Sequence, residues 1–183
     1  MSTEQLIREA VCENGYDEKV ADALCNLSRY MQRRQWWGAC HASSSALYVA
    51  LSELGFKPRL CIGEVKERDI YFDHSWIELD GKIIDMAIGM TLMGGASVSE
   101  PILFGKNIKT GREPIVEYGF CGRGIEDESL SVLNLPFVDY MDAYPDEKDG
   151  LWSVVSELIG REIDIDILRC KYKDVDRILI RKK

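Results

Sequence analysis

Apolar residues recur at helical spacing in three stretches before residue 58. The first covers residues 3–13, with Ser2 or Thr3 as its cap and Asn14-Gly15 after its end. The second follows the capping residue Asp17 and ends near Arg33-Arg34, and its apolar positions are Val20, Ala23, Leu24, Leu27, Tyr30 and Met31. The third covers residues 39–54 and is stopped by Gly55 and Pro58. The pattern therefore predicts three helices.

After Pro58 the pattern becomes that of β-structure. It predicts strands over residues 59–65, 70–79, 82–86 and 115–120, and a helix over 151–159. Residues 89–99 contain Gly94-Gly95 and read as a loop, and residues 133–150 read as a long shaped loop or short helices. Helices followed by strands of this kind predict an α+β fold.

One hairpin can be given a register from sequence. Asp80-Gly81 lies between two β-rich runs, which is a strong signal for a two-residue turn. If Leu79 pairs with Lys82, Trp76 lies opposite Asp85 and His74 opposite residue 87. His74, Trp76 and Asp85 then share one face, with His74 diagonal to Asp85 and within side-chain reach. We therefore expect Asp85 to orient the His74 imidazole through a hydrogen bond.

The same register excludes two neighbouring acids. Asp73 lies on the opposite face of the strand, and Asp69 lies outside the paired region. Structural explanations stay open: a histidine beside Trp76 can be a hydrogen-bonded core residue, and Asp85 can cap a turn.

Cys40 lies in the first turn of the third predicted helix and follows Gln35-Trp36-Trp37-Gly38-Ala39 in the sequence. A helix N-terminus carries partial positive charge, which favours a thiolate over a thiol. With His74 as a base and Asp85 as its orienting acid, the chain has the residue types of a cysteine-nucleophile enzyme. His41 would point away from Cys40 by about 100°, so we expect it to pack or tune the site. A zinc site on Cys40 and His41 lacks further paired ligands, and no metal or cofactor is predicted.

These residues resemble the transglutaminase-like superfamily of cysteine enzymes. The resemblance rests on Trp37-Gly38-Ala39-Cys40 before a helix and on the run from His74-Ser75-Trp76 through the turn to Ile84-Asp85, and it covers roughly residues 20–90. It implies a papain/transglutaminase-like core, in which the nucleophile begins a central helix packed on an antiparallel sheet. It also implies the triad Cys40, His74 and Asp85. The calcium-binding elaborations of the animal transglutaminases are not evident in this sequence.

Length, charge and cysteine usage limit the remaining possibilities. With 183 residues, we expect a single domain with its core at about 17–90 and a substrate-shaping elaboration at 91–183. A net charge of −8 argues against a nucleic-acid binder. The six cysteines form no CxxC pair, and the N-terminus shows no apolar signal core. We expect a cytoplasmic protein without membrane association, in which the cysteines other than Cys40 are structural thiols: Cys12, Cys25, Cys61, Cys121 and Cys170.

The sequence thus predicts acyl transfer from an amide, in a peptide or isopeptide, through a thioester on Cys40. Hydrolysis is the preferred outcome, because water is always present. A transamidase or acyltransferase with the same triad, and an inert copy used for protein binding, stay open. The candidates for binding the oxyanion or substrate are Gln35, Trp36, Trp37 and Trp76. A peptide or protein substrate is expected, and the oligomeric state is left open.

Overall fold

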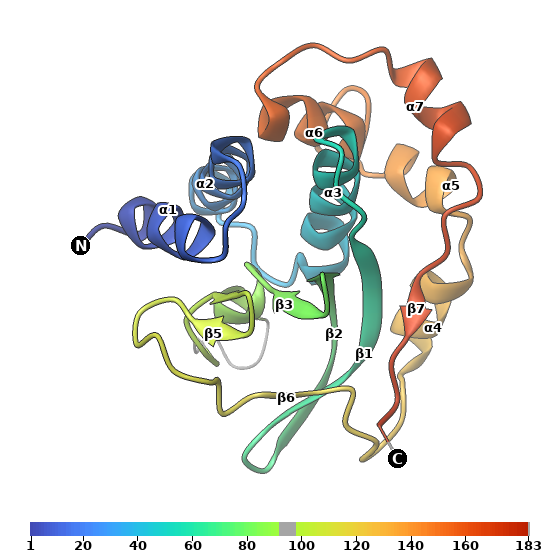
Figure 1. The fold of residues 1–183 in the computed structure, drawn as a ribbon. Coiled ribbons are helices and arrows are strands. Elements are labelled where there is room, and N and C mark those ends of the chain that lie inside the picture. The colour runs from blue at the N-terminus through green and yellow to red at the C-terminus, as the bar shows by residue number, and fades with distance from the viewer. Residues whose placement is uncertain (92–97, 183) are drawn as a thin grey trace.

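The computed structural model describes residues 1–91 and 98–182, and it has the predicted α+β architecture (Figure 1). The helices are α1 (Thr3–Glu13), α2 (Glu18–Arg34), α3 (Cys40–Glu53), the 3₁₀ turn η1 (Ile88–Met90), α4 (Asp127–Asn134), α5 (Phe137–Asp142), α6 (Leu151–Ile159) and α7 (Ile165–Lys171). The strands are β1 (Arg59–Glu67), β2 (Ile70–Leu79), β3 (Lys82–Ile84), β4 (Ile102–Leu103), β5 (Lys106–Asn107), β6 (Glu117–Tyr118) and β7 (Ile178–Leu179).

Local signals explain the first two helices. The Ser2 hydroxyl accepts a hydrogen bond from the Gln5 N–H, and the Gln5 side-chain oxygen accepts one from the Ser2 N–H, which forms a capping box at α1. Asp17 caps α2 in the predicted manner. Helix α2 ends at Arg34 because Gln35 adopts a left-handed conformation with φ 49°.

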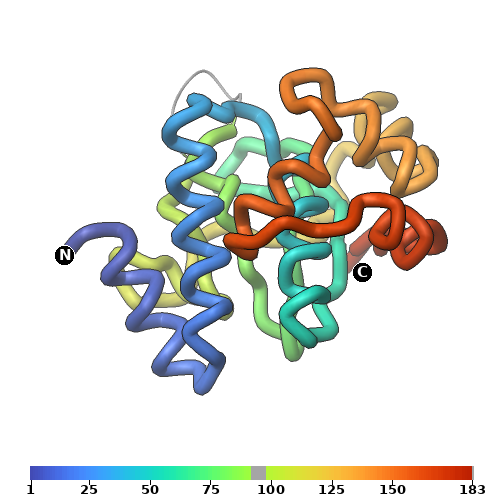
Figure 2. Tube along the Cα trace, turned by 90° about the horizontal axis from the view of Figure 1, so that it is seen from above, coloured from blue at the N-terminus to red at the C-terminus, as the bar shows by residue number. Residues whose placement is uncertain are grey.

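Helix α3 is the central helix of the fold. It packs against β1 and β2 of the sheet on one side and against α2 and α6 on the other. Figure 2 shows α6 lying across α2 and α3. This surrounding explains why α3 has nine buried residues and little amphipathic character. Because the helix is enclosed, its N-terminal end is held firmly against the sheet.

The main sheet has the strand order β3-β2-β1-β6, and β7 pairs with β1 in parallel. The register of β2 and β3 is the predicted one, with Leu79 opposite Lys82 and Ile77 opposite Ile84. Gly63 of β1 lies opposite His74, and a Cβ atom there would lie 2.7 Å from the Ile180 carbonyl oxygen. A glycine at position 63 therefore permits the close approach of the chain after β7.

The second half of the chain departs from several predictions. The strand predicted over 82–86 ends at Ile84, and Asp85 forms a bridge with Ile102 instead of lying opposite Trp76. The strand predicted over 115–120 is reduced to the two residues of β6, whereas short helices occupy part of 133–150, which is one of the two predicted outcomes. Part of the loop predicted over 89–99 lies in residues 92–97, outside the described residues, and its first two residues belong to η1. The helix predicted over 151–159 forms with those bounds as α6.

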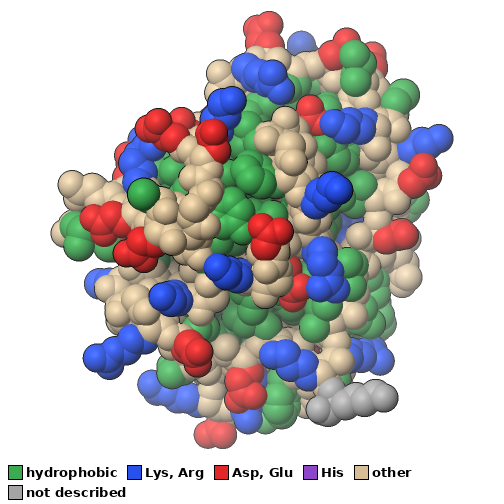
Figure 3. All heavy atoms as spheres, viewed as in Figure 1, with side chains coloured by type: hydrophobic (Ala, Val, Ile, Leu, Met, Phe, Trp, Pro, Cys, Tyr) green, Lys and Arg blue, Asp and Glu red, His purple; other side chains and the backbone are tan. Residues whose placement is uncertain are grey.

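Side chains of both charges are interspersed on the face seen in Figure 3, with apolar groups between them. Cys25 and Cys61 are buried, whereas Cys12, Cys121 and Cys170 are exposed, and all six cysteines are free. In the described part of the chain, none of the helices combines the length and apolarity of a membrane span.

Candidate active site

Cys40 is the first residue of α3 and lines a cavity of about 560 Å³. The residue before it, Ala39, provides no side-chain cap for the helix. The first N–H groups of a helix have no partner within the helix, so this end of α3 presents unpaired donors beside the thiol. The preceding Gly38 has φ 69° and donates its N–H to the Met90 carbonyl at 2.8 Å, which ties this turn to η1.

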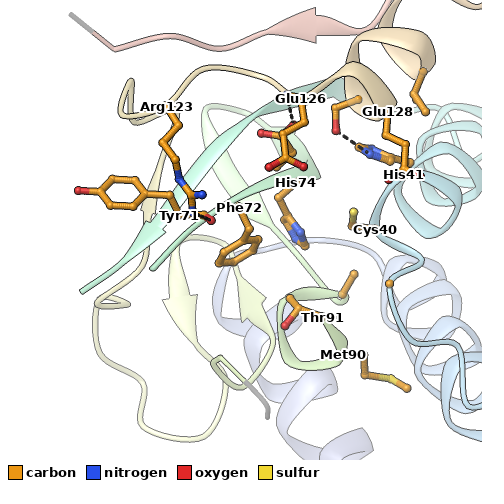
Figure 4. Close-up of a pocket in the computed structure, with 15 residues that line it drawn as sticks. Cys40, His41, Tyr71, Phe72, His74, Met90, Thr91, Arg123, Glu126 and Glu128 are labelled. Atoms are coloured by element: carbon orange, nitrogen blue, oxygen red, sulfur yellow. Dashed lines mark hydrogen bonds between the residues drawn. The ribbon is translucent and has the colours of Figure 1, made fainter. Parts of the chain in front are cut away.

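His74 and Asp85 form a buried pair. The His74 Nε2 atom lies 2.8 Å from the Asp85 Oδ2 atom, and both residues are 1% exposed. A carboxylate oxygen can only accept, so the imidazole donates from Nε2 and leaves Nδ1 free for another partner. Figure 4 shows the His74 ring beside the Cys40 side chain. The structure therefore brings Cys40, His74 and Asp85 together, although Asp85 reaches His74 from a bridge with Ile102 and not from the extended hairpin.

The charge of His74 is governed by its neighbours. Burial lowers the pKa of the imidazole, but the Asp85 carboxylate and the Cys40 side chain favour the protonated ring and raise the pKa to about 10. An imidazolium at neutral pH is therefore expected next to Cys40. A positive charge in this position stabilises a thiolate.

Asp85 is held by four hydrogen bonds. Its Oδ1 atom accepts the N–H groups of Ala87 and Ile88, each at 3.0 Å. Its Oδ2 atom accepts the Tyr118 hydroxyl at 2.7 Å in addition to His74. Sequence reasoning did not identify Tyr118, because β6 is only two residues long and lies 33 positions from Asp85.

The cavity contains residues from both halves of the chain. It is lined by Gly38, Cys40, His41, Tyr71, Phe72, Asp73, His74, Ala87, Met90, Thr91, Arg123, Glu126, Glu128, Ser129 and Val132. Figure 4 shows Phe72 and Tyr71 on one side of His74 and Cys40, with Glu126 and Glu128 on elements that follow the hairpin in sequence. The wall thus combines aromatic groups with charges of both signs.

Arg123 reaches the cavity because its loop is anchored to the sheet. The carboxylate of Glu64, only 4% exposed, accepts the N–H groups of Gly122, Arg123 and Gly124. Burial raises the pKa of Glu64, but these N–H groups outweigh burial and lower it below its ordinary value. The guanidinium of Arg123 donates to the Tyr71 carbonyl at 2.9 Å. Glu64 therefore fixes one wall of the cavity without lining it.

Asp73 takes the position that the hairpin register predicts, away from Asp85. Its Oδ2 atom accepts the Glu126 N–H at 2.8 Å, which joins β2 to the start of α4. Burial raises the pKa of Asp73. The acid rejected as an orienter of His74 therefore helps to place the α4 wall of the cavity.

His41 forms a second polar connection beside Cys40. Its Nδ1 atom lies 2.6 Å from the Ser75 hydroxyl, and its Nε2 atom lies 3.4 Å from the Ser129 hydroxyl. Burial, together with the charges of His74 and Arg177, lowers the pKa of His41 to about 4. A neutral His41 therefore links α3, β2 and α4.

This depressed pKa predicts a pH-dependent stability. A histidine in the unfolded chain titrates near pH 6.5. Between about pH 4 and 6.5, His41 is therefore protonated in the unfolded state and neutral in the folded state. His41 thus contributes stability above pH 6.5 that is lost as the pH falls towards 4, on the order of 3 kcal/mol. In His41→Gln, we expect a smaller change in the free energy of unfolding between pH 6.5 and 4, measured by urea denaturation. An equal change in both proteins would contradict this prediction.

The four oxyanion or substrate-binding candidates do not line the cavity. The Gln35 side chain donates to the Gln32 carbonyl at the end of α2. Trp36 is 8% exposed and packs edge-on against Tyr30 and Tyr144, whereas Trp37 is 42% exposed. Trp76 is fully buried against the ring of Tyr118. The Cys40 N–H, at the start of α3, is a cavity donor that helix geometry leaves without an intrahelical partner and therefore favours for an oxyanion.

No set of three or more metal-ligating side chains of His, Cys, Asp or Glu occurs among residues 1–91 and 98–182. Cys40 and His41, which sequence reasoning considered for zinc, contact different partners. His41 uses both ring nitrogens towards serine hydroxyls.

Comparison with known proteins supports the resemblance seen in the sequence. The sequence model of the transglutaminase-like superfamily matches residues 3–91, which include Cys40, His74 and Asp85. This segment belongs to the transglutaminase-like superfamily. The transglutaminase-like segment ends at Thr91, so Tyr118, Arg123 and the α4 residues of the cavity lie beyond it. No curated protein and no solved structure matches the chain.

Proposed function

We propose that this transglutaminase-like chain is a cysteine-dependent enzyme that cleaves an amide bond through a thioester on Cys40. The observation that carries the proposal is the placement of Cys40 beside a histidine whose Nε2 atom is bound to the buried Asp85 carboxylate at 2.8 Å. The three residues have the roles of nucleophile, general acid–base and orienting acid.

In the first half-reaction, the Cys40 thiolate attacks the carbonyl carbon of the amide and forms a carbon–sulfur bond. The electron pair of the carbonyl moves to its oxygen, and the Cys40 N–H at the start of α3 stabilises that oxyanion. The intermediate then collapses, and the carbon–nitrogen bond breaks. His74 gives its proton to the departing amine, which leaves a thioester and a neutral imidazole.

In the second half-reaction, His74 takes a proton from water as the water oxygen attacks the thioester. The carboxylic acid leaves, and the thiolate–imidazolium pair is restored. An amine in place of water gives transamidation by the same steps. We propose hydrolysis because Cys40 is partly exposed and water is always present.

The size and lining of the cavity support a peptide or isopeptide substrate. A volume of about 560 Å³ suits a few residues of an extended chain. Phe72, Met90 and Val132 offer apolar contacts, while Arg123, Glu126 and Glu128 offer charged ones. This mixture fits a peptide segment with both backbone and side-chain polar groups.

The rate of Cys40 alkylation tests the proposal. With iodoacetamide at pH 6, we expect Cys40 to react on the order of 10–100-fold faster than the exposed thiols of Cys12, Cys121 and Cys170, because Cys40 reacts as a thiolate. Mass spectrometry of tryptic peptides measures all four rates in one sample. The exposed cysteines are internal controls for reagent access.

Equal rates at Cys40 and at the exposed cysteines would support an inert copy of the fold and contradict the proposal. If Cys40 is activated, incubation with peptide libraries, with and without an added primary amine, distinguishes hydrolysis from transamidation. Free carboxylic acid in both samples indicates a hydrolase. Incorporation of the amine indicates a transamidase.

A further inference from the structure

We propose that Tyr118 is a positioning residue for the histidine–aspartate pair: its hydroxyl holds the Asp85 carboxylate and sets how strongly Asp85 polarises His74. The inference extends the proposed function to a residue beyond the superfamily match at 3–91. The expected change in kcat rests on the proposed function, whereas the expected change in the His74–Asp85 hydrogen bond does not.

The hydrogen bonds at Asp85 define what Tyr118 does. The Oδ1 atom is occupied by the main-chain donors of Ala87 and Ile88. The Oδ2 atom is shared by His74 Nε2 at 2.8 Å and the Tyr118 hydroxyl at 2.7 Å. The Asp85 side chain has no exposed surface. A buried carboxylate requires hydrogen-bond donors from the protein in place of water. The Tyr118 hydroxyl is the donor that shares the Oδ2 atom with His74.

Tyr118 is itself fixed in place. It is 3% exposed, it pairs with Val65 of β1, and its ring lies edge-on to Trp76 with centroids 5.0 Å apart. Burial and the Asp85 charge raise the pKa of the phenol well above its ordinary value. The hydroxyl therefore keeps its proton and acts only as a donor to Asp85.

Two effects follow from this shared oxygen. The hydroxyl limits rotation of the carboxylate, so Oδ2 stays in line with the His74 ring. It also withdraws charge from Oδ2, which weakens the pull of Asp85 on the imidazolium proton. Without Tyr118, His74 would hold its proton more tightly and would give it up more slowly to the leaving amine.

Tyr118→Phe tests the inference, since it removes the hydroxyl and keeps the ring against Trp76. The chain has only two histidines, so the His74 Nε2–H resonance can be assigned by nitrogen-15 NMR with His41→Gln as reference. We expect this resonance to move downfield in Tyr118→Phe. We also expect kcat for amide cleavage to fall about 10-fold with little change in KM, and the His74-linked limb of the pH–rate profile to move to higher pH.

Tyr16→Phe is the matched control. The Tyr16 hydroxyl donates to Asp80 Oδ2 at 2.6 Å, in the turn of the same hairpin but outside the cavity. In Tyr16→Phe, we expect the His74 resonance and the pH–rate profile to equal those of the wild-type protein. If Tyr118→Phe fails to fold, difluorotyrosine at position 118 replaces it. The more acidic phenol donates more strongly, so the resonance must then move upfield.

The outcomes are separable. A folded Tyr118→Phe protein with an unchanged His74 resonance and an unchanged pH profile would overturn the inference. A wild-type protein without acyl-enzyme formation would overturn the proposed function, while a shifted resonance would still support the role of Tyr118.

Discussion

His74→Gln is expected to slow acylation of Cys40 by about 10²–10⁴-fold, the range that a positioned general acid–base contributes. Glutamine has a similar reach but can neither carry the proton for the leaving amine nor provide a cation beside the thiolate. The pKa of His74, raised to about 10, places the imidazolium across the neutral range, and this charge is lost in the variant. Single-turnover formation of the acyl-enzyme, followed by intact-protein mass spectrometry, measures the effect.

Thermal unfolding of His74→Gln shows whether its effect reflects chemistry or instability. His74 is fully enclosed, so its replacement also removes a buried hydrogen bond with Asp85. A folded variant that acylates Cys40 within threefold of the wild-type rate would remove His74 from the mechanism.

Asp85→Asn is expected to keep the fold and to lower the rate of acyl-enzyme formation by about 10²–10⁴-fold. An asparagine amide can present an NH₂ group to His74 Nε2 and so favour the wrong tautomer. Without the carboxylate, burial is opposed by the Cys40 side chain alone, and the pKa of His74 should fall from about 10. NMR titration of His74 and the acylation rate measure the two effects.

Asp142→Asn is the matched control for Asp85→Asn. Asp142 also accepts a hydrogen bond from an aromatic residue, Trp152 Nε1 at 2.6 Å, but it does not line the cavity. We expect Asp142→Asn to affect stability without changing the pKa of His74. Wild-type acylation in Asp85→Asn would show that Asp85 has no part in orienting the base.

The hairpin was predictable because its information is local. Asp80-Gly81 specifies a two-residue turn, and once Leu79 pairs with Lys82 the alternation of side chains fixes every face. This register places His74 on the side of Asp85 and Asp73 on the other. It fails only after Ile84, where Asp85 bonds to the main chain of Ile102. No local signal predicts that Asp85 pairs with Ile102 in place of Trp76, because Ile102 lies outside the hairpin.

The oxyanion candidates show a different limit of sequence reasoning. Gln35 precedes Cys40 by five positions, and this spacing alone does not decide whether its side chain can bind the oxyanion. Its left-handed backbone turns its side chain back to the Gln32 carbonyl. Trp36 packs against Tyr30 and Trp76 packs against Tyr118, both in the core. Spacing along a chain sets how far a residue can reach, but packing decides where its side chain points.

By itself, the sequence determined the α+β fold, the position of Cys40 in the first turn of the central helix, and the strand faces of His74 and Asp73. These features depend on caps, periodicity and a tight turn, which act between residues close in sequence. Only the tertiary structure decided that Tyr118 completes the bonds of Asp85, that Glu64 anchors the Arg123 loop, and that α4 closes the cavity wall. Each of these contacts joins segments more than 30 residues apart, where burial and hydrogen-bond satisfaction across the whole fold choose the partner.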